Sequence, residues 1–129
     1  MKKVLRLIVG FIGLLFLSMG LRWLLAPAGI AAELGMPLLD GVGRSTQIGD
    51  LSAFFITLGL CVLIALSTRN SQWYYPAILL LGLTAFGRMI AWLIHDAALP
   101  LQIIAPEIIF SVILLIAARV LKESVVSKP

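Results

Sequence analysis

Four long apolar stretches dominate this chain and leave few folds open to it. They cover about residues 4–25, 45–66, 73–94 and 101–118, and a helix over any of them could cross the hydrocarbon core of a bilayer. Hydrophobic residues make up 61% of the chain and charged residues 12%, whereas soluble domains have about half and about a quarter. A soluble fold of this length could not bury so much apolar surface. The sequence therefore predicts an all-α integral membrane protein with a single transmembrane domain over residues 1–129.

Short connections between these stretches predict an antiparallel four-helix bundle. The connection over 26–43 is the longest, and in it Pro27 suits the first turn of a helix. Residues 28–34 are too few to cross a bilayer, so we expect one short interfacial helix between spans 1 and 2. Ser45 or Thr46 is the N-cap expected for the second span.

The first apolar stretch has two interpretations. It follows a basic head and ends near Ala26-Pro27-Ala28, a pattern that also occurs at signal-peptide cleavage sites. Because the apolar run continues past Arg22 and Trp23 and further spans follow, we interpret it as the first spanning helix. Small residues inside it would let a neighbouring helix approach closely, and these are Gly10, Gly13 and Gly20.

Lysine and arginine gather on one side of the predicted bundle. That side receives Lys2, Lys3, Arg6, Arg69, Arg119, Lys122 and Lys128. The opposite side receives Arg22 and Arg44. Because cytoplasmic loops carry the excess of these residues, we expect both termini in the cytoplasm. Basic residues at the ends of apolar runs do not make the clustered, solvated face that nucleic acids require, so no nucleic-acid partner is predicted.

An arginine stands inside the third apolar stretch and needs a partner there. At a helical rise of about 1.5 Å per residue, Arg88 lies about 22 Å, Glu107 about 18 Å and Asp50 about 25 Å from the cytoplasmic boundary. A lone charge at the centre of a span costs about 2.5–3.5 kcal/mol, so such groups face the bundle and pair. We expect Asp50 and Glu107 to hold the Arg88 guanidinium. Arg44, nearer the surface, would pair with either carboxylate or with Asp96.

Two interpretations of this cluster stay open: an ion pair that only fixes helix register, or a polar pocket open to the outer leaflet. Trp92 and His95 share the helical face of Arg88. For His95, an interfacial hydrogen-bonding role is favoured over a proton relay, the alternative that imidazole chemistry allows. One histidine with scattered carboxylates lacks the usual metal-ligand set, so neither a metal nor a cofactor is predicted. The candidate ligand-binding residues are Arg44, Asp50, Arg88, Trp92, His95, Asp96 and Glu107.

The order of these residues resembles that of a known membrane family. Arg44 to Asp50 opens the second span, Gly87-Arg88 lies deep in the third, Asp96 follows at the turn, and Glu107 begins the fourth. With the length and four spans, this is similar to the bacterial family catalogued as domain of unknown function 4345, which is itself loosely similar to the DoxX-like small four-helix membrane proteins. The resemblance covers nearly the whole chain, although Ala97 stands where a glycine is expected after the turn aspartate. It implies a bacterial inner-membrane location and names no substrate.

Three functions fit this sequence. The favoured one is non-enzymatic: the protein binds a small amphiphile, whose anionic head group Arg44 and His95 would meet, or acts as an accessory membrane subunit. Proton-coupled transport through Glu107 or Asp50 is the alternative, opposed by the few polar residues in the inner halves of the spans. The third and least favoured function is an enzyme acting on a lipid-soluble substrate. Against it, the sequence has one histidine and no evident nucleophile. The expected partners are the lipid bilayer and an amphiphilic small molecule, with a homo-oligomer or a membrane partner protein left open.

Overall fold

The computed structural model describes residues 1–122, and within them the chain forms helices and no strand. The long helices are α1 (Lys2–Leu25), α3 (Gly41–Thr68), α4 (Tyr74–Ile94) and α5 (Leu101–Val120). This confirms the predicted all-α bundle. Each long helix has the length and hydropathy needed to cross a membrane, which fits a membrane protein. Lys128, one of the basic residues expected on the cytoplasmic side, lies outside the described residues.

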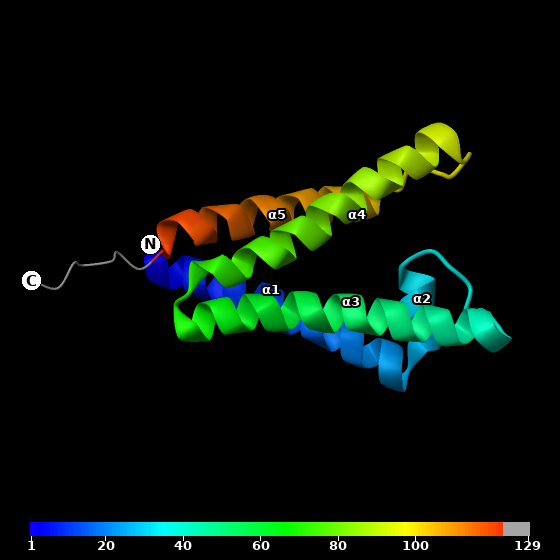
Figure 1. Cartoon of the computed structure of the whole chain (residues 1–129), viewed down its shortest axis with the longest axis horizontal. Helices are drawn as coiled ribbons and strands as arrows, with labels where there is room; N and C mark the ends of the chain where they lie inside the picture. The colour runs from blue at the N-terminus through cyan, green and yellow to red at the C-terminus, as the bar shows by residue number, and fades with distance from the viewer. Residues whose placement is uncertain (123–129) are drawn as a thin grey trace, which may run out of the picture.

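The long helices alternate in direction along the bundle (Figure 1). The N terminus and the connection between α3 and α4 lie at one end, where the chain forms the 3-10 turn η1 (Ser71–Trp73). The other two connections lie at the opposite end, and the longer one contains the short helix α2 (Pro27–Glu33). That helix is within one residue of the predicted 28–34.

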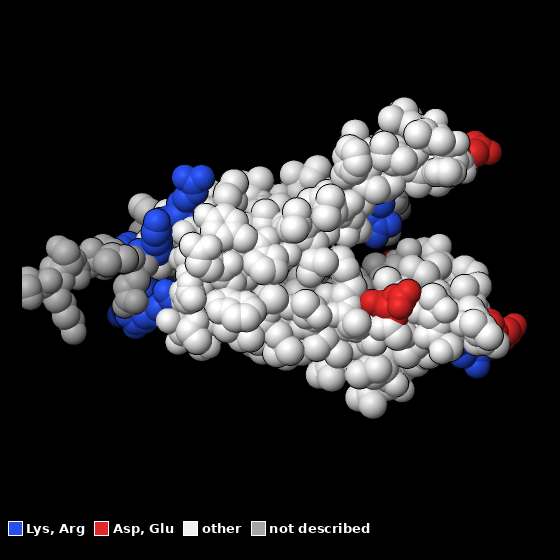
Figure 2. Space-filling model, in the orientation of Figure 1, with Lys and Arg blue, Asp and Glu red and all other residues white. Residues whose placement is uncertain are grey.

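Charge is distributed unevenly along the bundle axis (Figure 2): within residues 1–122 most lysines and arginines lie at one end, whereas Arg22, Arg44 and Arg88 lie with the acidic residues in the other half. The end with the N terminus, which we call the basic end, carries Lys2, Lys3, Arg6, Arg69, Arg119 and Lys122. The acidic residues within 1–122 belong to the opposite end, here called the acidic end, or to the half of the bundle next to it, and they are Glu33, Asp40, Asp50, Asp96 and Glu107.

The second spanning helix begins earlier than predicted. Its N-cap is Asp40, in an extended conformation, and not Ser45 or Thr46. The backbone N–H of Arg44 donates to the carbonyl of Asp40 at 3.4 Å, so the polar residues 44–47 continue the helix. The side chain of Arg44 also binds Leu39 and Asp40, just before the first turn, which explains why the helix starts ahead of the apolar run.

Helices α1 and α3 make the most extensive contact of any two helices, and glycines allow it. A Cβ added at Gly59 would lie 2.6 Å from the backbone nitrogen of Leu17. A Cβ at Gly20 would lie 2.8 Å from the backbone nitrogen of Ile56, and Gly13 is also packed against α3. The predicted close approach at the glycines of the first span is confirmed for Gly13 and Gly20, with α3 of the same chain as the neighbour.

Helices α4 and α5 pack mainly on each other, and their contact with α1 and α3 is concentrated near the basic end. The buried residues of α4 are Tyr74, Ala77, Leu81 and Ala85, none of them in its last two turns. Tyr74 is 1% exposed and belongs to the core, whereas its neighbours Trp73 and Tyr75 are exposed. Past Ala85 the α4–α5 pair diverges from α1 and α3, and a hollow opens between the two arms at the acidic end (Figure 2).

Candidate functional site

A hollow of about 190 Å³ lies where the two helix pairs separate. All four long helices contribute to its wall, and Leu34, just after α2, adds a side chain from the connection. Most of the lining is hydrocarbon or aromatic, including Phe16, Met19, Phe54, Ile103 and Phe110. The hollow therefore suits an apolar group that enters between the arms.

Arg88 and Glu107 bring charge into this apolar setting. The Arg88 Nε donates a hydrogen bond to Glu107 Oε1 at 3.1 Å, which joins α4 to α5. The Arg88 side chain is 31% exposed and that of Glu107 12% exposed. The bond uses one guanidinium nitrogen, and the two terminal nitrogens donate no hydrogen bond to residues 1–122. Glu107 Oε2 is buried and also lacks a partner there.

Such unpartnered groups define what the hollow can recognise. A buried polar atom without a hydrogen bond costs about 1–3 kcal/mol, so a ligand that supplies the missing partner gains binding energy. Arg88 offers N–H donors and Glu107 offers an acceptor, so a head group that both accepts and donates satisfies the two together. Nearby, Pro106 has no N–H to give to the carbonyl of Gln102, and both residues line the hollow.

Asp50 is not part of this arrangement. Its side chain is exposed on α3 and forms no ion pair with residues 1–122, so the second carboxylate expected beside Arg88 is not found. The reason is geometric: in this half of the bundle α3 packs on α1, and α4 stands apart from it. Depth along the axis agrees between Asp50 and Arg88, but the two helices do not meet there.

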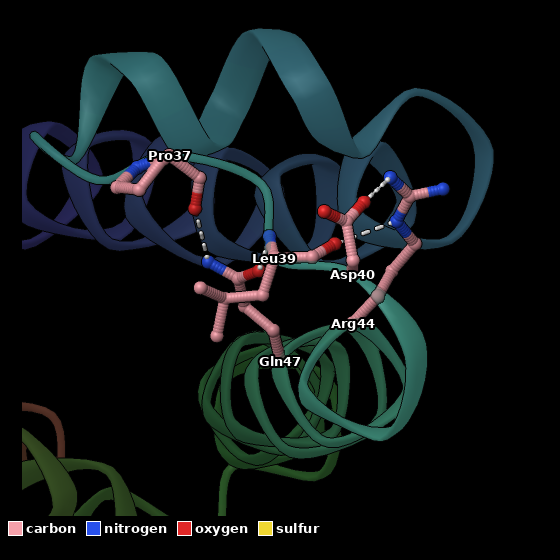
Figure 3. Close-up of polar contacts among 5 residues, drawn as sticks. All are labelled: Pro37, Leu39, Asp40, Arg44 and Gln47. Atoms are coloured by element: carbon pink, nitrogen blue, oxygen red, sulfur yellow. Dashed lines mark hydrogen bonds and ion pairs between the residues drawn. The ribbon is translucent and has the colours of Figure 1, made fainter.

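Arg44 and Gln47 hold the connection between α2 and α3 (Figure 3). Arg44 donates to the Leu39 carbonyl at 2.7 Å and to Asp40 Oδ1 at 3.1 Å. Gln47 is 8% exposed; its Oε1 accepts from the Leu39 N–H at 2.9 Å, and its Nε2 donates to the Pro37 carbonyl at 3.0 Å. The two side chains clamp an irregular segment onto the first turns of α3.

This clamp changes the interpretation of Arg44. The structure pairs it with Asp40 instead of Asp50, Glu107 or Asp96. The sequence places Gln47 on the same helical face as Arg44, at a spacing of three, but sequence reasoning assigned it no role in holding the connection. Leu34, the residue of the connection that lines the hollow, precedes the clamped residues and is held instead as the C-cap of α2.

Trp92, His95 and Asp96 lie outside the hollow, all exposed at the end of α4. His95 is the C-cap, and its backbone N–H donates to the carbonyl of Ala91 at 3.0 Å. Asp96 follows with a positive φ of 56°. Trp92 and His95 are spaced to share a face with Arg88, but α4 extends past the part of the bundle that covers that face. Of the candidate residues, the hollow brings together Arg88 and Glu107.

A third polar link fastens α2 to the end of α1. Arg22 donates from Nη1 to Glu33 Oε2 at 2.9 Å and from Nη2 to Oε1 at 2.7 Å. These hydrogen bonds, helped by the opposite charge, lower the pKa of the Glu33 carboxyl below its usual value. The pair is solvent-exposed, so it positions α2 without adding much stability.

No family model, curated protein or solved structure matches this chain. Within residues 1–122 no group of three or more histidine, cysteine, aspartate or glutamate side chains is arranged to hold a metal ion. The functional inference therefore starts from the geometry around Arg88 and Glu107.

Proposed function

We propose that this protein lies in a bacterial inner membrane with its basic end in the cytoplasm and binds a small amphiphile in the hollow at Arg88 and Glu107. The orientation is supported by the lysines and arginines at the basic end, because such residues accumulate on the cytoplasmic side. We also propose that the chain is a member of the family catalogued as domain of unknown function 4345. In this orientation the hollow faces the outer leaflet.

One observation carries the binding proposal. In an apolar hollow, the terminal nitrogens of Arg88 and the Oε2 of Glu107 have no partner within residues 1–122. In lipid, ionisable groups face a cavity or a partner and mark ligand pathways. A head group that bridges the guanidinium and the carboxylate, such as a hydroxyl or a protonated acid, completes both sets of hydrogen bonds.

The size of the hollow limits the ligand. Its volume of about 190 Å³ is below the roughly 300–1,000 Å³ of sites that enclose drug-sized molecules. The head group and the first part of a chain fit beside Arg88, against the wall formed by Phe16 and Phe110, whose rings pack edge-to-face on each other. The rest of the tail would lie between the parted arms, in contact with lipid. A single-chain amphiphile meets these conditions better than a two-chain phospholipid.

A photoreactive fatty alcohol tests this proposal. Dodecanol carrying a diazirine on its chain would be added to the protein in nanodiscs, illuminated, and the labelled residues mapped by mass spectrometry. We expect labelling of hollow residues such as Met19 and Phe110, competed by unlabelled dodecanol. Arg88→Lys keeps a positive charge beside Glu107 but loses the guanidinium fork, and should reduce this labelling about ten-fold, since a hydrogen bond to a charged group contributes about 1.5–3 kcal/mol.

Arg44→Lys is the matched control, because Arg44 is also at the acidic end but does not line the hollow. Labelling of Met19 and Phe110 should be unchanged in that variant. Label spread over exposed residues of α4 such as Leu79 and Leu83, to the same degree in wild type and in Arg88→Lys, would contradict the proposal.

A further inference from the structure

A second hollow, of about 400 Å³, lies at the basic end. It is formed by the end of α3, the turn η1 and the end of α5, far from Arg88. Three cationic residues line it, Arg69, Arg119 and Lys122, together with uncharged polar side chains that include Asn70 and Gln72. No acidic residue within 1–122 lines it.

The three cations come from parts of the chain about fifty residues apart and meet only in the fold. Arg69 follows α3 and Arg119 lies in the last turn of α5, with Lys122 just beyond. Arg69 has φ 55° and ψ 27°, the left-handed conformation in which helix ends usually place glycine or asparagine. Like charges held together repel, so their convergence on one concave surface favours an anion between them.

The level of this hollow along the bundle indicates the kind of anion. It lies at the ends of the apolar helices, beside Trp73 and Tyr75, which are 41% and 40% exposed. Exposed tryptophan and tyrosine at span ends sit at the head-group level of a bilayer. Basic pockets between helices at that level bind phosphate-bearing lipid head groups.

We propose that the hollow at the basic end binds the phosphate head group of an anionic phospholipid from the adjacent leaflet. Arg69, Arg119 and Lys122 surround the phosphate, and Asn70, Gln72 and Tyr75 offer polar groups to the rest of the head group. Lys2 and Lys3 lie at the same end but do not line the hollow. The proposed site therefore consists of the cations that line the hollow, and not of the general excess of basic residues at this end.

Native mass spectrometry of the full chain in a non-ionic detergent tests this. Phosphatidylglycerol and phosphatidylcholine would be titrated separately, and the bound fraction counted. Each cation contributes about five-fold in affinity for an anionic lipid, so the double variant Arg69→Asn with Arg119→Gln should bind phosphatidylglycerol about 25-fold more weakly. Asparagine suits the left-handed conformation of position 69, so folding is preserved. Phosphatidylcholine binding should be weak in both proteins.

The matched control is Lys2→Gln with Lys3→Gln, which removes the same charge from the same end outside the hollow. It should change phosphatidylglycerol binding less than about two-fold at physiological salt, where distant charges are screened. An equal loss in the control and the test variant would overturn the proposal, as would equal binding of the two lipids. In a further arm, displacement of phosphatidylglycerol by millimolar inorganic phosphate would assign the hollow to a soluble phosphate and overturn the lipid assignment.

Discussion

The two helix pairs of this bundle are built differently. Between α1 and α3 the backbones touch, because Gly13, Gly20 and Gly59 remove the side chains that would separate them. The α4–α5 pair has no such seam with the rest: Cβ atoms added at Gly82 and Gly87 of α4 would meet nothing within 4 Å. Its burial is concentrated near the basic end, and its far halves part from α1 and α3.

Because of this difference, the α1–α3 pair acts as the scaffold, and the looser α4–α5 pair borders the candidate site. In lipid, helix association depends on close van der Waals packing and small residues, so the α1–α3 seam supplies a rigid base. The hollow with Arg88 and Glu107 lies where α4 and α5 diverge from α1 and α3. Its width therefore depends on α4 and α5, the less tightly packed pair. The looser packing of α4 and α5 thus leaves room for a ligand between the helix pairs, next to Arg88 and Glu107.

The largest effect is expected from filling the α1–α3 seam. In Gly59→Ala the new Cβ would press on the Leu17 backbone, which cannot move aside, and the free energy of unfolding should fall by about 3 kcal/mol. The matched change on the open pair is Gly82→Ala, which should be neutral or stabilise by up to about 1 kcal/mol. Unfolding in mixed micelles of dodecylmaltoside and dodecyl sulfate measures both. Equal losses in the two variants would remove the distinction between the helix pairs.

A smaller loss is expected at the charged pair. Arg88→Ala leaves the Glu107 carboxylate buried without its cation, and should destabilise by about 2 kcal/mol, below the cost of a lone mid-span charge because the pair is partly exposed. Replacing both partners, Arg88→Leu with Glu107→Leu, should recover most of that loss. If the double variant were no more stable than Arg88→Ala, the unpaired carboxylate would not be the cause.

The clamp on the connection should contribute less again. Gln47→Ala removes two hydrogen bonds and leaves the Leu39 N–H and the Pro37 carbonyl unpaired, so we expect a loss of about 1–2 kcal/mol. Its neighbour Thr46 is exposed, and Thr46→Ala should stay within about 0.5 kcal/mol of wild type. Hydrogen exchange of residues 34–40 should rise in Gln47→Ala alone. Unchanged exchange there would show that Gln47 does not hold the segment.

The smallest effect concerns Arg22 and Glu33. Because the pKa of Glu33 is lowered in the folded state, its contribution to stability is present above the pKa of the unfolded carboxyl and is lost as pH falls through the folded pKa. The unfolding midpoint of wild type should therefore drop slightly more than that of Glu33→Gln between about pH 6 and pH 3. Parallel pH profiles would mean that the pair does not influence folding.

Much of the fold could be predicted because the hydropathy of each span is a local property. The start of α3 at Gly41 could not, because the glycine-containing residues 41–44 disfavour a helix locally and are held helical by contacts of Arg44 to Leu39 and Asp40. Sequence spacing gives the depth of Arg88, Glu107 and Asp50 along their helices. It does not give the separation between helices at that depth, which is why one carboxylate meets Arg88 and the other does not.

The most direct test of the parted arms is a pair of distances between spin labels in nanodiscs, measured by double electron–electron resonance. In a Cys61→Ala background, labels at Val42→Cys and Leu93→Cys report the separation of α3 from α4 at the acidic end, and labels at Leu24→Cys and Val42→Cys report α1 and α3. We predict a broad α3–α4 distribution that narrows when dodecanol is added, beside a narrow α1–α3 distribution that does not change. An α3–α4 distance distribution as narrow as that of α1–α3, and unaffected by dodecanol, would contradict the claim that the two helix pairs part to accept a ligand.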